Sequence, residues 1–184
     1  MPNNYKKVKY SLCSLSFDAS TGRFGDKVDT LFSAPSTGKT AVFPRVSPDG
    51  NLLAFTLADY GNFAIWHKEA DLCLIDLRTS EIKALDKVNS PEAESYHSWS
   101  NNGRWLVFVS RREDGLYSRP YIAFIDKDGT AHKPFVLPQA DPDFYLNSLT
   151  SYNVPEFIVE PVTLERREII QMAQEGIPVK VTLQ

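Results

Sequence analysis

The same succession of polar turn and apolar run occurs at two places in the chain. Residues 46–55 read VSPDGNLLAF and residues 99–108 read WSNNGRWLVF, which aligns Gly50 with Gly103. Each polar tetrapeptide suits a tight turn, because its glycine accepts the positive φ that such turns require. The nearly continuous apolar run that follows has the length of a strand, and it predicts a strand that is covered on both faces.

A second pair of matching segments follows the first. Residues 70–85 and 120–137 both read as an apolar strand, an aspartate, a polar turn and another strand, with Asp76 and Asp126 at equivalent places. Their turns carry the Gly, Ser and Thr expected of hairpin loops. A third copy of this hairpin alone, with Asp18 before a longer turn, stands near the start of the sequence.

Together these segments make a unit of four strands over about 50 residues, which is a repeat length typical of propeller blades. We therefore predict an all-β fold, a partial β-propeller of four-stranded antiparallel blades with two full blades plus an outer hairpin. The propeller is expected over residues 1–160, and its parts are the outer hairpin 11–34, the blades 41–86 and 96–138, and an irregular connector 139–160.

Helical periodicity is scarce until residues 163–176, which read TLERREIIQMAQEG. Apolar residues recur there at the spacing of one helix face, and Gly176 suits the position that follows a helix. The residues of that face are Leu164, Ile169, Met172 and Ala173. We predict a short C-terminal helix, which together with the tail after it makes up the segment 161–184.

The blade pattern, RVSPDGNLLAF followed by DLCLIDLRTSEIKAL, resembles the TolB-like, WD-repeat-like β-propeller family of bacteria. The resemblance covers residues 11–137, and the second blade departs from it at Asn101 and Asn102, which still suit a turn. It implies C-terminal blades of a periplasmic or envelope-associated propeller that is used for protein contacts. Similar blades also occur as accessory domains in serine peptidases of the prolyl oligopeptidase type, so the blade alone does not assign a function.

The number of blades is too small for a closed ring, because propellers use about 4 to 8 blades. Either the 184 residues are the C-terminal part of a longer polypeptide, or two or more chains assemble and cover each other's ends. Exposed apolar faces of outermost sheets drive association. Homo-oligomer formation through the exposed blade faces is compatible with both alternatives.

The charge balance argues against two classes of partner. The 20 Lys and Arg residues and 23 Asp and Glu residues are interleaved and leave a net charge of -3. Such a chain has no field that would gather nucleic acid or an anionic membrane surface. No stretch approaches the roughly 20 apolar residues of a membrane span, and the first residues do not form a signal peptide. We expect no nucleic-acid partner and no membrane insertion.

A catalytic site has no recognisable motif in this sequence. The patterns HExxH, CxxC and GxSxG are absent, and the three histidines, His67, His97 and His132, lie on different segments. Residues 34–40, APSTGKT, resemble the end of a phosphate-binding loop, but the glycine that this motif requires is replaced by Ser33. We predict a protein that is not an enzyme and uses no cofactor.

Metal and disulfide chemistry have equally little support. Cys13 and Cys73 lie inside apolar runs, so we expect two buried free thiols rather than a disulfide. Asp141 and Asp143 flank a proline and could offer oxygen ligands, but a calcium site needs 6 to 8 oxygens. The segment around them is better explained as a packed connector.

The longer loops carry the residues best suited to binding. In a propeller, the loops between the second and third strands and those between blades share one face, here residues 58–71, 89–97 and 110–121. Aromatic and arginine side chains on such loops dominate contact energetics, so we predict a binding surface for a protein or peptide. Its candidate residues are Tyr60, Phe63, Trp66, His67, Tyr96, His97, Arg111, Arg112, Tyr117 and Arg119.

A structural explanation of the same residues also stands. Phe63, Ile65 and Trp66 would then fold back over the blade as a plug. Arg111 and Arg112 would pair in solvent with Glu113 and Asp114. The leading functional hypothesis is a non-enzymatic interaction module. The alternatives are an accessory domain of a hydrolase whose catalytic part lies outside this chain, and a glycan-binding or ligand-binding propeller.

Overall fold

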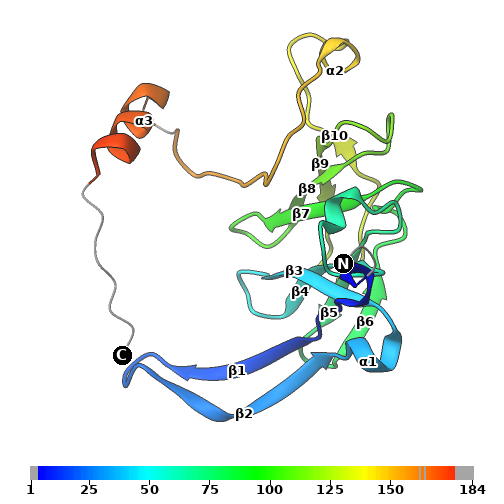
Figure 1. Ribbon diagram of the computed structural model, residues 1–184, viewed down its shortest axis with the longest axis vertical. Helices are drawn as coiled ribbons and strands as arrows, with labels where there is room; N and C mark the ends of the chain where they lie inside the picture. The colour runs from blue at the N-terminus through cyan, green and yellow to red at the C-terminus, as the bar shows by residue number, and fades with distance from the viewer. Residues whose placement is uncertain (1–3, 162, 164, 177–184) are drawn as a thin grey trace.

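Two four-stranded antiparallel sheets form the centre of the molecule (Figure 1). The computed structural model describes residues 4–161, 163 and 165–176. The first sheet has the strand order β3 (Thr40–Val46), β4 (Leu52–Ala58), β5 (Asp71–Asp76) and β6 (Glu81–Ala84). The second sheet has the same succession, β7 (Glu94–Trp99), β8 (Trp105–Ser110), β9 (Arg119–Phe124) and β10 (Phe135–Val136). The predicted class of four-stranded antiparallel blades is confirmed.

The two polar turns that the sequence aligns have the same hydrogen bonds. Ser47 Oγ donates to Asp49 Oδ1 at 2.6 Å, and Ser100 Oγ donates to Asn102 Oδ1 at 2.7 Å. Carboxylate and amide oxygens both accept this bond, so the second turn tolerates asparagine where the first has aspartate. The glycine that follows has positive φ in both turns, 75° at Gly50 and 65° at Gly103.

The two sheets lie face to face, as consecutive blades of a propeller do. Leu52 and Leu74 of the first sheet share one buried cluster with Leu106, Phe108 and Tyr121 of the second. These residues alternate along their strands, because successive side chains point to opposite faces of a sheet. Burial of this inner face alone would give alternation, so the nearly continuous apolar runs of β4 and β8 reflect cover on both faces of these strands.

The opposite face of the first sheet packs against the base of a separate hairpin. Strands β1 (Leu12–Asp18) and β2 (Arg23–Phe32) form a two-stranded sheet that projects from the body of the molecule (Figure 1). Leu12 and Phe32 join Leu53 and Phe55 in a second core cluster. The predicted outer hairpin therefore exists, and no inner strands accompany it among the described residues.

The turn of this hairpin has the same hydrogen bond as the turn between β5 and β6, the two outer strands of the first blade. Asp18 Oδ1 accepts a hydrogen bond from the backbone N–H of Ser20, and Asp76 Oδ1 accepts one from Arg78, each at 2.9 Å. The apolar side chains beyond its base are exposed, and these are Leu15, Phe17, Phe24 and Val28. Since Leu15 pairs with Val28 and Phe17 with Phe24, they form one stripe across the two strands.

A bulge that the hydrophobic pattern does not predict interrupts the first strand of each blade. The register shifts between Val42 and Arg45 in β3 and between Ser95 and Ser98 in β7. Each bulge holds one aromatic residue in the left-handed conformation, which is uncommon for any residue but glycine. These residues are Phe43, with φ 56°, and Tyr96, with φ 47°, and their ring centroids are 4.8 Å apart.

The connector that follows the second blade is held along it by hydrogen bonds. Ser98 Oγ of β7 donates to the carbonyl of Pro155 at 2.8 Å, and Ser118 Oγ donates to the carbonyl of Tyr152 at 2.5 Å. A short helix, α2 (Phe144–Asn147), lies within it. The Asp141 carboxylate accepts a bond from the backbone of its neighbour Asp143, as expected in a packed connector.

The C-terminal helix stands apart from the sheets (Figure 1). Helix α3 spans Arg166–Glu175 and buries none of its side chains, so Ile169, Ile170 and Met172 are exposed. Glu165 and Glu168 form a capping box at its start. The predicted stripe residue Leu164 and the tail 177–184 lie outside the described residues.

The prediction of two buried thiols is half wrong. Cys73 is buried and Cys13 is exposed, because the hairpin face that carries Cys13 is uncovered. Both thiols are free. Burial raises the pKa of the Cys73 thiol to about 12. No helix within the described residues has the length and apolar character that a membrane crossing would need.

Candidate functional site

The long loops gather at one end of the two sheets. The backbone N–H of Glu94 donates to the carbonyl of Ala70 at 2.8 Å, and that of Arg111 donates to Ala93 at 3.1 Å. These bonds join the loop after β4 to the segment before β7 and to the loop after β8. The short turns lie at the other end, where the N–H of Leu77 donates to the carbonyl of Asn51 at 2.9 Å.

The loop between β4 and β5 presents two aromatic rings to solvent. It contains the short 3-10 helix η2 (Ala64–Trp66), whose N-cap Phe63 has the left-handed φ of 53°. Ile65 is buried and anchors the loop, whereas Phe63 is 71% exposed and Trp66 is 63% exposed. Of the three residues that could have formed a plug, only Ile65 folds inward.

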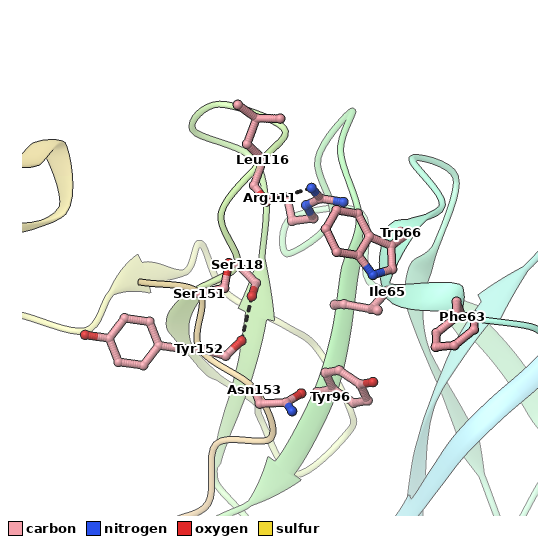
Figure 2. A pocket seen from close by; sticks show the side chains of 10 residues that line it. All are labelled: Phe63, Ile65, Trp66, Tyr96, Arg111, Leu116, Ser118, Ser151, Tyr152 and Asn153. Carbon is pink, nitrogen blue, oxygen red and sulfur yellow. Dashed lines mark hydrogen bonds between the residues drawn. The ribbon is translucent and has the colours of Figure 1, made fainter. Parts of the chain in front are cut away.

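A pocket of about 290 Å³ lies between this loop, the second blade and the connector. Figure 2 shows Trp66 and Arg111 along one side, Ser118 and Ser151 along the other, and Tyr96 near the base. The sequence had identified Trp66, Tyr96 and Arg111, and the fold brings them together with Phe63. The connector residues of this pocket were missed, because nothing in the sequence indicates that the chain returns to the first loop.

Arg111 is the most unusual residue of the pocket. Its guanidinium carbon lies 4.0 Å from the centroid of the Trp66 ring, which is a cation–π contact. Nη2 donates to the carbonyl of Leu116 at 2.6 Å. The residue is only 6% exposed, and burial lowers the pKa of the guanidinium from its usual value.

The carboxylates whose charges act on Arg111 are engaged elsewhere. Glu92 pairs with Lys68 at 2.5 Å, and Asp114 pairs with Arg119 at 3.0 Å. Among the described residues, no carboxylate lies within 4.0 Å of the Arg111 guanidinium. The pocket therefore holds a positive charge that no neighbouring acidic group neutralises directly.

A second hollow of about 390 Å³ lies on the other side of the exposed rings. Tyr60 and His67 line it, and their ring centroids are 3.8 Å apart. The Nδ1 atom of His67 lies 3.5 Å from Glu69 Oε1. Phe63 and Trp66 border both hollows, and we refer to these two residues as the aromatic ridge.

Arg112 points away from this surface, into a buried polar cluster. Its Nη2 lies 3.2 Å from Glu94 Oε1, and its guanidinium carbon lies 4.4 Å from the centroid of the Tyr121 ring. Glu94 is fully buried and also accepts hydrogen bonds from Ser90 Oγ at 2.7 Å and Ser110 Oγ at 2.6 Å. The sequence offers no signal for this cluster, because its members come from three separate segments.

Three further candidate residues are buried, namely His67, His97 and Arg119, and for the last two the predicted position on the loop surface is wrong because they lie in strands. His97 lies inside β7 and is 1% exposed, and burial lowers the pKa of its imidazole to about 4. Arg119 begins β9 and lies against the Tyr145 ring. Tyr117 is half-buried and stays on the loop, where its N–H donates to Asp114 Oδ1 at 2.9 Å. The binding roles of the residues that remain on the surface stay predictions.

A metal centre is not apparent in the part of the chain that the structure describes. No group of three or more His, Cys, Asp and Glu side chains there could hold a metal ion. Burial, with the nearby charge of Glu94, raises the pKa of Asp71 to about 6, but Asp71 lines neither hollow of the loop surface.

Comparison with known proteins adds solved structures only, because no family model and no curated protein matches the sequence. The β-propeller domain of the Trilobed protease from Pyrococcus furiosus, described as having an open velcro topology, is 16% identical over 72% of this chain, with a TM-score of 0.41. Pyrococcus horikoshii acylaminoacyl peptidase is 15% identical over 74%, with a TM-score of 0.38. A structure from a study of two prolyl endopeptidases is 13% identical over 71%, with a TM-score of 0.31.

This chain spans 36%, 26% and 27% of those three chains. With TM-scores below 0.5, the assignment of the fold depends on the sheets themselves. Two successive four-stranded antiparallel sheets, packed face to face and not closed into a ring, make this a partial β-propeller.

Proposed function

We propose that this chain is a non-enzymatic interaction module of the TolB-like kind that its sequence resembles, and that it binds a protein partner through the aromatic ridge. One observation supports the proposal most directly. Phe63 and Trp66, at 71% and 63% exposed, stand between two hollows on the loop end of the blades. Exposed aromatic side chains beside hollows are typical of the anchor positions of protein interfaces.

The ridge is held in position before any partner arrives. The N–H of Trp66 donates to the carbonyl of Phe63 at 2.9 Å, buried Ile65 fixes the loop, and Arg111 packs on the Trp66 ring. A binding surface that is already ordered loses less conformational entropy on association. The order of the ridge therefore lowers the entropic cost of binding a partner through this small surface.

The partner and its compartment follow from the resemblance. We propose a protein or peptide of the bacterial envelope, and the periplasm as the site of action. The evenly mixed charges of the chain, with a net charge of -3, favour neither nucleic acid nor an anionic membrane surface as the ligand.

We further propose that the flanks of the blade stack associate with other polypeptide. The stripe Leu15, Phe17, Phe24 and Val28 leaves one flank exposed. Such surfaces are covered by further blades in a closed propeller, or by a second copy of the chain if this chain acts alone.

The ridge is tested by selecting peptides from a random displayed library against the protein. A Phe63→Ser/Trp66→Ser variant is compared with a Leu146→Ser/Leu149→Ser variant, which removes two equally exposed apolar side chains elsewhere. We expect the selected peptides to bind the ridge variant at least about 30-fold more weakly, and the control variant equally, because interface anchors contribute about 2 kcal/mol or more. Equal binding by both variants at unchanged Tm would contradict the proposal.

The complete open reading frame distinguishes the interaction module from an accessory domain of a hydrolase. A serine hydrolase segment with a GxSxG motif in the same polypeptide would assign the propeller to that enzyme. An open reading frame without such a segment supports the interaction module.

A further inference from the structure

The pocket beside the ridge pairs a buried cation with an aromatic surface. Arg111 is 6% exposed, its charge has no carboxylate partner within 4.0 Å among the described residues, and its guanidinium lies on Trp66. Burial of a charge without an opposite charge is costly, so a preformed pocket that holds one is suited to an anionic group. The carboxylates nearby do not occupy that role, because Glu92 and Asp114 each have another cation.

Building on the proposed function, we propose that this pocket binds the C-terminal residue of the partner. The terminal carboxylate contacts Arg111, and an apolar side chain of the same residue packs against Trp66 and Phe63. The inference names the chemistry of the ligand, and it depends on the ridge being the binding surface.

The short distance between the Arg111 guanidinium and the Trp66 ring favours a C-terminal residue over an internal acidic residue as the ligand. The guanidinium carbon is 4.0 Å from the Trp66 ring centroid, so the ligand must present its carboxylate and its apolar group only a few bonds apart. A C-terminal residue carries both on one Cα. In an extended internal segment, by contrast, an acidic side chain and its apolar neighbour point to opposite sides.

The size of the pocket agrees with a single residue. Its volume of about 290 Å³ lies at the lower limit of ligand pockets, which range over roughly 300–1,000 Å³. Ser118 contributes no free donor, since its hydroxyl donates to the Tyr152 carbonyl at 2.5 Å. Arg111 is the charged group in the pocket lining, so it is the group that recognises the carboxylate.

Three short peptides test the assignment. They are N-acetyl-Ala-Ala-Phe with a free carboxylate, the same peptide with a C-terminal amide, and N-acetyl-Ala-Asp-Phe-amide, which carries its carboxylate on a side chain. Binding is followed by the shifts of the Trp66 indole N–H in heteronuclear NMR spectra. We expect the free acid to bind at least about tenfold more tightly than either amide, because a charge-assisted hydrogen bond is lost in each.

Two variants and one control identify the residues that cause the difference in affinity between the acid and the amide. Arg111→Gln should weaken the free acid at least about tenfold, to the level of its amide, while Leu146→Ser leaves both affinities unchanged. Arg111 also holds the Leu116 carbonyl, so Trp66→Ala provides a second test that keeps this bond. It should weaken all peptides that end in Phe, with an unchanged Tm, and isothermal titration calorimetry measures binding to this variant because it lacks the indole probe.

Several results would overturn the inference. They are equal affinities for acid and amide, binding of the Asp peptide as tightly as the free acid, and full binding of the free acid by folded Arg111→Gln. If these occur while library peptides still require the ridge, the proposed function stands and only the carboxylate assignment fails. If the ridge variant also binds library peptides normally, both proposals fail.

Discussion

Replacement of Arg112 by alanine tests the structural role that the fold gives to a residue once expected on the binding surface. Arg112 donates to the Val88 carbonyl at 2.6 Å and lies 3.2 Å from Glu94 Oε1. Glu94 has no exposed surface, so Arg112→Ala leaves a buried carboxylate without its cation. A side chain on the binding surface would have no such consequence.

The size of the loss in unfolding free energy depends on the hydrogen bonds that Glu94 keeps. Breaking a buried ion pair from one side costs about 3–5 kcal/mol. Glu94 keeps its bonds from Ser90 Oγ at 2.7 Å and Ser110 Oγ at 2.6 Å, and the Arg112 side chain is itself 19% exposed, so part of that cost is offset. We expect Arg112→Ala to lower the free energy of unfolding by about 2–4 kcal/mol.

Urea denaturation at pH 7 measures this change, and a double-mutant cycle assigns it. Glu94→Gln and Arg112→Ala are made singly and together, and their coupling should reach about 1 kcal/mol or more, because the two groups share one network. A loss below about 0.5 kcal/mol for Arg112→Ala, which is usual for surface residues, would refute the reasoning.

Two further predictions concern titratable groups. Burial lowers the pKa of His97 from 6.5 to about 4, so the unfolded state binds the proton more tightly, and stability should fall as the pH drops from about 6.5 to 4, by about 3 kcal/mol in total. Asp71, with its pKa raised to about 6, makes stability rise as the pH drops from about 6 to 3.8, which opposes the effect of His97. The test is therefore the difference in the free energy of unfolding between the wild type and His97→Gln at each pH. A difference that does not change with pH would contradict the burial of His97. For the thiols, Cys13 should react with a maleimide in the folded protein, whereas buried Cys73 should react only after unfolding, as mass spectrometry would show. Equal labelling of the two would mean that the first sheet is open.

The blades could be predicted from the sequence because their determinants are local. The serine at the start of each turn donates a hydrogen bond to the side chain two residues later. The pairs Ser47–Asp49 and Ser100–Asn102 therefore recur at the same spacing in the sequence. The apolar runs after these turns are nearly continuous because both faces of the strands are covered. A repeat of such short-range features is sufficient to identify the unit.

The parts that were missed depend on contacts between distant residues. Strand β7 begins at Glu94, but its first residues are polar and read as loop, so His97 was expected at the surface. The fold buries them because Ser90 and Ser110 satisfy the Glu94 carboxylate. Bulges such as that at Tyr96 are likewise invisible to apolar periodicity, because one extra residue shifts the alternation.

The candidate site was found only in part for the same reason. Aromatic and arginine residues on long loops indicated Phe63, Trp66 and Arg111, and the structure places all three around one pocket. Residue type alone did not separate Arg111, which faces Trp66, from Arg112, which faces Glu94. The direction of each side chain is decided by the strand that precedes it, and the sequence does not give that register.

The central claim is that two blades lie face to face and that the apolar stripe of the hairpin beside them is left uncovered. Light scattering of the isolated 20.8 kDa chain tests it most directly, in the wild type and in a Phe17→Ser/Phe24→Ser variant of the exposed stripe. We expect the wild type to have the mass of a dimer or larger species, and the variant to shift toward the monomer. A wild type that stays monomeric across the micromolar range would contradict the account.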